Sequence, residues 1–241
     1  MKRLFWVLSG LLFPQVRCFG CDEPRNITPG SALCDDCIVS LVSMRIPEQA
    51  CPHCRSSKKA GQGCVYCANG GMAYLDSAFA PFAYIGIARQ LIHHLKFGPF
   101  ELAAVPLAAA MAECVSGQTF DRMVPVPLHA ASERERGVNQ SMLLCRLISS
   151  QTSLPIMNAL VKTRRTKRQS SMPGRKRAAN VKGAFYVRDT VKNLRILLVD
   201  DVRTSGATAR ECAKALREAG ASSVSLLTAA VADGKEIGDV S

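Results

Sequence analysis

One stretch of sequence decides the fold of this chain: Leu197-Leu-Val-Asp-Asp-Val-Arg-Thr-Ser-Gly-Ala-Thr208. The apolar run Ile196–Val199 is typical of a central strand that is covered on both faces. Two carboxylates, Asp200 and Asp201, follow the run, and a helix is predicted over Ala207–Ala219. Ligands of open α/β sheets bind at the carboxyl ends of the strands. The stretch therefore predicts a strand, a ligand-binding loop and a helix in succession.

The loop after the two aspartates has the chemistry of a phosphate site. Thr204-Ser-Gly-Ala-Thr208 offers free amides and hydroxyls at a helix amino terminus, which suits a phosphate dianion. Gly206 allows the backbone to approach closely. Two carboxylates beside a phosphate would repel the ligand unless they hold other groups, and sugar hydroxyls or Mg²⁺ are the natural candidates. The segment as a whole therefore predicts a site for a sugar phosphate.

Strands and helices are predicted to alternate through most of the remaining chain. Extended segments are predicted over residues 72–87, 122–127, 182–187 and 223–231. Helices are predicted over residues 88–97, 101–116 and 134–150, the last with a capping box formed by Ser132 and Glu135. This alternation implies a parallel sheet flanked by helices, which is an α/β fold.

Eight of the 11 cysteines form four CxxC pairs near the amino terminus. The pairs are Cys18/Cys21, Cys34/Cys37, Cys51/Cys54 and Cys64/Cys67. Four thiolates close a tetrahedron around Zn²⁺ and leave no open position, so we expect structural zinc, two ions in all. Consecutive and crossed pairing of the motifs are equally compatible with the spacing. Disulfides or a redox-active CxxC are the alternative reading.

An apolar run of about ten residues, Leu4–Phe13, is too short to span a membrane, which requires about 20 residues. We expect a short helix that packs on the protein. A cleaved signal peptide is the alternative, although no small-residue cleavage site follows. No other apolar stretch reaches spanning length, so the sequence predicts no membrane span. The many paired thiols favour a cytoplasmic location.

The positive charge of the chain is concentrated in one segment. The 241 residues carry a net charge of +12, and residues 136–188 contain 12 of the 31 Lys and Arg but no Asp or Glu. A uniformly basic packing protein is therefore excluded, and one basic surface or loop is expected. The segment 136–184 contains no Phe, Tyr or Trp. Contact with nucleic acid would consequently involve the backbone rather than stacked bases.

The stretch 197–208 resembles the fingerprint with which type I phosphoribosyltransferases bind phosphoribosyl pyrophosphate (PRPP). The resemblance implies that Asp200 and Asp201 hold the 2′ and 3′ hydroxyls of the ribose. The residues that it assigns to the PRPP loop, around the 5′-phosphate, are Val202, Thr204, Ser205, Gly206, Ala207 and Thr208. Arg203 departs from the usual pattern, which has an uncharged residue there, and is expected to alter the rim of the site.

Further motifs narrow the resemblance to the ComF family. They are Val124-Pro-Val-Pro-Leu-His129, Arg134-Glu-Arg-Gly-Val-Asn-Gln-Ser141, Thr166-Lys-Arg-Gln169, Arg177-x-x-Asn180-Val-Lys-Gly-Ala-Phe185, Leu95-Lys96-Phe97-x-Pro and the CxxC pairs. The resemblance implies a type I phosphoribosyltransferase-like parallel sheet flanked by helices, preceded by a small cysteine-rich zinc-binding module. It also implies an association with DNA uptake, competence or the use of external DNA.

On this basis the chain is divided into a segment 1–71, with a short apolar helix and the zinc module, and a phosphoribosyltransferase-like domain 72–241. Within the domain, residues 72–120 are the expected hood and 121–232 the core. The resemblance places the pyrophosphate end of the ligand, with its Mg²⁺, against a turn and a mobile basic loop over residues 162–177. The expected residues are Pro127, His129, Arg136, Lys167, Arg168, Gln169, Arg177 and Asn180. His129 is equally compatible with a role that only caps the turn.

Two functions from different classes follow. The chain is either a Mg²⁺-dependent phosphoribosyltransferase or sensor that binds PRPP or a related ribose phosphate, or a non-enzymatic accessory protein with a vestigial ligand site. The second function would use the basic loop to hold the backbone of DNA, with single-stranded DNA or competence proteins as partners. A third alternative is that the basic loop is solvent-exposed and binds no partner.

Overall fold

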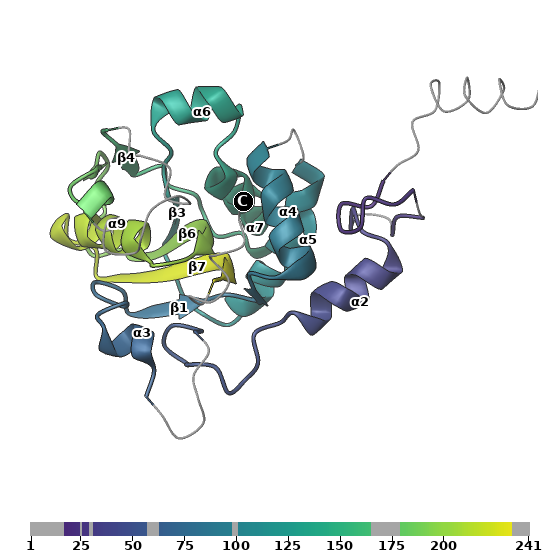
Figure 1. The fold of residues 1–241 in the computed structure, drawn as a ribbon. Coiled ribbons are helices and arrows are strands. Elements are labelled where there is room, and N and C mark those ends of the chain that lie inside the picture. The colour runs from purple at the N-terminus through teal and green to yellow at the C-terminus, as the bar shows by residue number, and fades with distance from the viewer. Residues whose placement is uncertain are drawn as a thin grey trace, which may run out of the picture.

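A parallel sheet forms the centre of the computed structural model, which describes residues 17–24, 26–28, 31–56, 63–97, 101–164 and 179–232. Its strands are β1 (Ser77–Phe79), β2 (Phe82–Ala83), β3 (Arg122–Pro125), β6 (Arg195–Arg203) and β7 (Ser223–Val231). The order is β1-β7-β6-β3, and β2 also pairs with β7 (Figure 1). All of these pairings are parallel. The predicted α/β sheet is confirmed.

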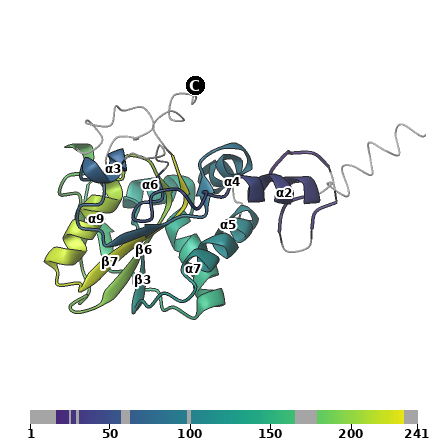
Figure 2. The ribbon, with the colours of Figure 1, turned by 90° about the horizontal axis from the view of Figure 1, so that it is seen from below.

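Helices cover both faces of the sheet (Figure 2). On one face lie α4 (Gly86–Phe97), α5 (Glu101–Cys114) and α7 (Gln140–Thr152), and on the other lies α9 (Ala207–Glu218). Successive residues of β6 point to opposite faces, so Leu197 and Val199 join the core under α4, α5 and α7 while Leu198 packs against α9. Burial on both faces explains why the run Ile196–Val199 within this strand is continuously apolar.

The segment 72–120, expected as a hood, joins the main sheet. It supplies β1 and β2 at the β7 edge and the helices α4 and α5 on one face. The expected extended run 72–87 is thus two short strands followed by the start of α4 at Gly86. Whether the segment also shields a ligand stays a prediction.

The prediction of a single helix over residues 134–150 is wrong. The chain forms α6 (Ala130–Arg136) and α7, separated at Gly137, whose φ of 76° no regular helix adopts. The predicted capping box is also wrong, because α6 begins earlier with His129 as its N-cap and α7 has Asn139. Ser132 and Glu135 have the spacing of a capping box, but the left-handed Gly137 ends α6 and separates it from α7.

Two further differences concern strands. The strand predicted over residues 182–187 is shorter, and as β5 (Phe185–Val187) it pairs antiparallel with β4 (Leu160–Lys162) in a separate two-stranded sheet. Strand β6 is longer than its apolar run, since Asp200 and Arg203 still pair with β7. Parallel pairing with a long neighbour extends the strand into residues that are polar.

The two cysteine segments lie at different sides of the domain (Figure 1). The first carries α2 (Asp35–Ser43) and packs against α4, where Cys18, Cys34 and Cys37 join the core. The second carries α3 (Val65–Ala68) beside β1, where the amide of Ala78 donates to the carbonyl of His53 over 2.9 Å. The helix expected from Leu4–Phe13 lies outside the described residues. None of the helices in the described ranges has the length and apolar character that a membrane span requires.

Candidate functional site

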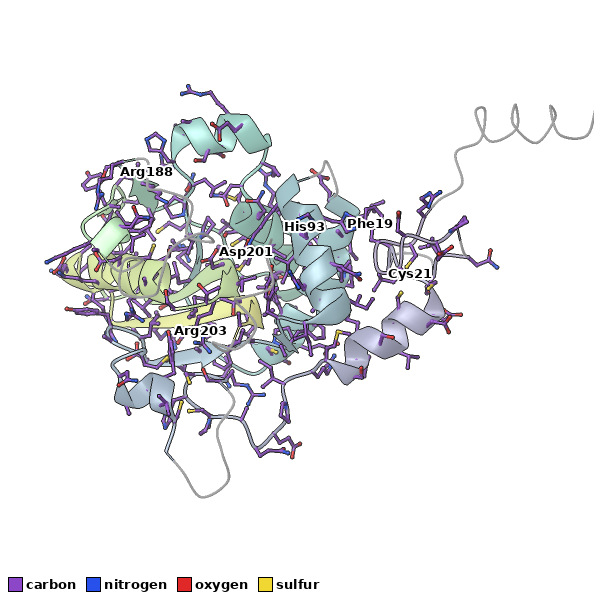
Figure 3. The ribbon with its side chains drawn as sticks, in the orientation of Figure 1. Phe19, Cys21, His93, Arg188, Asp201 and Arg203 are labelled. Carbon is purple, nitrogen blue, oxygen red and sulfur yellow. The ribbon has the colours of Figure 1, made fainter. Side chains whose placement is uncertain are left out.

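Two carboxylates stand at the carboxyl end of the central strand β6, between β3 and β7. The hydroxyl of Ser141 donates to Asp200 Oδ1 over 3.1 Å, and the amide of Asp201 donates to the same oxygen over 2.9 Å. The ammonium of Lys96, at the end of α4, lies 2.9 Å from Asp201 Oδ2. Figure 3 shows Asp201 near α4 and α7. The pair is therefore held by groups from three elements.

The local environment makes Asp200 unusually basic. Burial, followed by the charge of Asp201, raises the pKa of Asp200 to about 7, although hydrogen bonds and Lys96 act in the opposite direction. Burial alone would lower the pKa of Lys96, but the charge of Asp201 and its hydrogen bond raise that pKa overall. The ammonium of Lys96 thus offsets part of the repulsion between the two carboxylates.

Three consecutive residues at the start of α7 hold this arrangement together. Asn139 caps the helix through Oδ1 and also donates from Nδ2 to the carbonyl of Val126 at the end of β3, over 3.2 Å. Gln140 is buried and donates to the carbonyl of Leu95 over 3.0 Å. Ser141 holds Asp200. The triplet therefore ties β3, α4 and β6 to one another at the end of the sheet where the aspartates stand.

The predicted phosphate loop leads from β6 into α9. Gly206 is the N-cap of α9 in a left-handed conformation, with φ of 69°, and no side chain in the described ranges caps the helix. Its first amides are therefore free of an N-cap side chain, the arrangement that an anion requires. The guanidinium of Arg210 donates to the carbonyl of Ser205 over 2.8 Å. The hydroxyl of Ser205 is buried and has no hydrogen-bond partner among the described residues.

The residues predicted for the pyrophosphate end are only partly described. Pro127 follows β3, and His129 Nδ1 accepts the amide of Ala131 over 3.2 Å, so His129 caps α6. A role for His129 toward a ligand stays a prediction. Arg136 ends α6, and Asn180 is half-buried before β5. The remaining predicted residues lie outside the described ranges, namely Lys167, Arg168, Gln169 and Arg177.

The eight paired cysteines form two clusters that pair the motifs consecutively. Cys18, Cys21, Cys34 and Cys37 form one, and Cys51, Cys54, Cys64 and Cys67 the other; within each cluster all sulfur atoms lie within 4.8 Å. In the second, Cys51 and Cys67 Sγ are 3.7 Å apart, and Cys54 and Cys64 Sγ are 3.4 Å apart. A tetrahedron with Zn–S bonds of about 2.3 Å has sulfur separations of about 3.8 Å, so each cluster can hold a zinc ion.

Backbone amides prepare one thiol in each cluster for deprotonation. Burial raises the pKa of Cys18, but amides including those of Cys34 and Gly20 outweigh it and lower the pKa to about 6. The same balance lowers the pKa of Cys51 to about 7. Amide donors that stabilise a thiolate suit metal binding, because the thiolate is the ligand form.

Arg203 was expected to alter the rim of the site. Instead, it is buried against the second cluster (Figure 3). Its Nη2 donates to the carbonyl of Cys54 and to the hydroxyl of Ser56, and its guanidinium carbon lies 4.1 Å from the centre of the Tyr66 ring. Arg203, the residue that departs from the usual fingerprint, therefore connects strand β6 to a cysteine segment about 150 positions earlier.

Sequence reasoning missed several site residues. Lys96, Gln140 and Ser141 stand in strings that carried the ComF resemblance, but they received no role. The sequence offered a signal for these three residues, because they are polar residues within motifs whose other positions are explained by helix formation. Tyr66 and Ser56 carried no such signal, since only the folded chain brings them to Arg203.

Sequence comparison relates the chain to several known proteins. The chain is 30% identical over 198 residues to competence protein ComFC of Streptococcus pneumoniae, covering 80% of this chain and 85% of that protein. The chain belongs to the ComF family. Within the family it is 36% identical over 142 residues to the DNA utilization protein YhgH of Escherichia coli and 35% identical to that of Salmonella typhimurium. Those alignments cover 56% of this ComF chain and 63% of each relative.

Two solved structures, both of proteins with phosphoribosyl in their names, are similar to about half of this chain. The glutamine PRPP amidotransferase from B. subtilis is 26% identical, with a TM-score of 0.36, over 50% of this chain and 24% of that chain. The purine phosphoribosyltransferase from Pyrococcus horikoshii is 15% identical, with a TM-score of 0.32, over 51% and 69%. No family model matches the sequence.

Proposed function

We propose that this ComF protein binds PRPP or a related ribose 5-phosphate together with Mg²⁺, in the service of DNA uptake or the use of external DNA. The observation that carries the proposal is the convergence of two held carboxylates and an uncapped helix start at one end of β6. A phosphate and a polyhydroxylated sugar require these two kinds of group at a fixed separation.

The 5′-phosphate and the ribose each have a counterpart among the described residues. The amides and hydroxyls of residues 204–208 would hold the 5′-phosphate, and Asp200 and Asp201 would accept the ribose hydroxyls. Carboxylate oxygens are also ligands that Mg²⁺ accepts, so the ion would reduce the charge of the pyrophosphate near the pair. Pro127, His129 and the basic segment would face the pyrophosphate, and transfer to an acceptor would require its departure.

The test is ligand binding by the intact zinc-loaded protein. We expect PRPP with Mg²⁺ to raise the melting temperature and to give a calorimetric binding signal, and the double change Asp200→Asn with Asp201→Asn to remove both. Asp76→Asn is the control, because Asp76 accepts the Val224 amide near the opposite end of β7. It should retain the ligand response. Absence of any response in the unchanged protein would refute the proposal.

A DNA-binding role is the second candidate, and the names of the relatives favour it. Those proteins are named for DNA utilization and for competence. The acid-free segment 136–188 supplies the charge that a phosphate backbone requires. We expect binding of single-stranded DNA to weaken steeply with salt, to survive the aspartate changes and to be lost when Lys167, Arg168, Arg175 and Lys176 become Ala. Binding that persists in this last variant would contradict the role of the loop.

The cysteine clusters support two structural zinc ions, and the number of paired cysteines in the sequence supports a cytoplasmic location. A metal assay of the purified protein should return two zinc ions per chain. Cys21→Ser and Cys67→Ser should each lower the content by one, because consecutive pairing places these residues in different clusters.

A further inference from the structure

Arg203 is a buried cation for which the described part of the chain supplies no carboxylate. The residue is 3% exposed, and its Nη2 donates over 3.0 Å to Cys54 O and over 2.7 Å to Ser56 Oγ. Its Nε is buried, and no described residue offers it a hydrogen-bond partner. An unpaired buried charge is costly, so a negative charge is expected close to it.

The second cysteine cluster can supply that charge. Four thiolates around one divalent ion carry a net charge of −2, and Cys54, whose carbonyl Arg203 contacts, is one of the four ligands. The first cluster has no equivalent buried arginine among the described residues. Arg17, the neighbour of Cys18, has a side chain that is 60% exposed and lies 3.8 Å from Asp22. The two clusters therefore differ in how their charge is balanced.

The same contact reaches the predicted phosphate loop. The ring of Tyr66 stands over Arg203, and a Cβ at Gly206 would overlap the hydroxyl of Tyr66. Tyr66 lies between the ligands Cys64 and Cys67. The hydroxyls of Tyr66 and Ser205 are both buried, and neither has a hydrogen-bond partner within the described part of the chain. A shift of Tyr66 would consequently remove packing directly from the turn that begins α9.

We propose that Arg203 is the counter-charge of the second cysteine centre, and that Arg203 and Tyr66 couple metal occupancy there to the order of the loop 204–208. The inference rests on the proposed function for the identity of the loop's ligand. Coupling of this kind is reciprocal, so metal orders the loop and a ligand in the loop retains the metal.

Metal release from the intact zinc-loaded protein to a chromogenic chelator tests the first half. Cys21→Ser and Cys67→Ser assign the two release phases to their centres. We expect Arg203→Met to accelerate release from the second centre about 10- to 100-fold and to leave the first unchanged. Arg203→Lys should recover part of the loss, and Arg17→Met is the matched control. Equal effects of Arg203→Met on both centres, or none, would overturn the proposal.

Hydrogen exchange of the amides in residues 204–210 tests the second half without any ligand. Exchange should rise in Cys67→Ser and stay at the original rate in Cys21→Ser. Tyr66→Leu, which retains all eight cysteines, should also raise it, so the test holds even if Arg203→Met fails to fold. Exchange that responds equally to the loss of either centre, or to neither, would contradict the coupling.

A third measurement separates this inference from the proposed function. PRPP with Mg²⁺ should slow release from the second centre and leave the first unchanged. If PRPP does not bind at all, the proposed function fails, and the release and exchange rates above still decide the coupling. If PRPP binds but alters neither release nor exchange, the coupling fails and the proposed function stands.

Discussion

Lys96 and Asp201 form a partly buried ion pair across the end of the sheet, with Nζ 2.9 Å from Oδ2. The two side chains are 25% and 14% exposed. Gln140 anchors the carbonyl of Leu95 next to Lys96, so the reach of the ammonium is set by α7 as well as by α4. In the ligand-free protein the acidic pair is thus already neutralised in part, and a bound cation would compete with Lys96.

We expect Lys96→Met to destabilise the protein by about 2–4 kcal/mol at pH 8, because it leaves a partly buried carboxylate unpaired. The loss should be smaller at pH 6, where Asp200 can hold a proton, and Mg²⁺ should restore more stability to the variant than to the original protein. Denaturant titrations with and without Mg²⁺ measure both effects. Lys214→Met, which breaks a more exposed pair with Glu218, should cost less than about 1 kcal/mol at either pH.

Asp200 should make the protein less stable as the pH rises toward neutrality. Its pKa in the folded chain, about 7, is above the ordinary carboxyl value. Its contribution to stability is therefore complete below pH 4 and is lost as the pH rises through 7. Asp200→Asn should remove this dependence and stabilise the ligand-free protein at pH 8 by about 1–3 kcal/mol. A free energy of unfolding at pH 8 that falls in the variant would contradict the assignment.

Asp121 offers a comparison of opposite sign. Hydrogen bonds from Arg195 lower the pKa of Asp121 to about 2, so its contribution is present at neutral pH and lost as the pH falls toward 2. Asp121→Asn should therefore destabilise the protein at pH 7, whereas Asp200→Asn should not. Urea unfolding of both variants over pH 4–8 distinguishes the two cases.

Ser141→Ala should weaken the proposed ligand more than it weakens the fold. Removal of one hydroxyl costs about 1 kcal/mol of stability, but it also removes one of the two donors to Asp200 Oδ1 and so raises the pKa of Asp200 further. The melting-temperature response to PRPP with Mg²⁺ should decrease. Ser149→Ala removes a hydroxyl from the other end of the same helix, where it donates to Leu154 O over 2.8 Å. This control should lose similar stability and retain the response.

Gly206→Ala should disrupt the phosphate loop because the position combines a left-handed backbone with a close neighbour. Gly206 has φ of 69°, and an added Cβ would overlap Tyr66. Gly117 has a similar φ of 76° but open space around it, so Gly117→Ala isolates the backbone cost, about 1–2 kcal/mol. Thermal unfolding should show a larger loss for Gly206→Ala, with loss of ligand binding. Equal losses in the two variants would show that Tyr66 does not press on the loop.

Much of the site was predictable because it is local in sequence. The apolar strand, the aspartates and the uncapped loop follow one another within 197–208, and their order alone indicates a site at the end of a parallel strand. The four CxxC motifs are equally local, since each pair supplies two ligands from one turn. Contacts between distant segments are not predictable in this way, because only the fold brings Lys96 and Ser141 beside the aspartates.

The sequence by itself determined the α/β class, the position of the acidic pair and the number of cysteine motifs, because periodicity and short spacing act over a few residues. Only the tertiary structure decided that the CxxC motifs pair consecutively and that two helices, α6 and α7, replace the single predicted one. It also decided that Arg203 points into the second cysteine cluster rather than to the rim of the site. The physical reason is that burial of a guanidinium or a carboxylate is tolerable only beside partners, and those partners come from segments that the fold alone brings together.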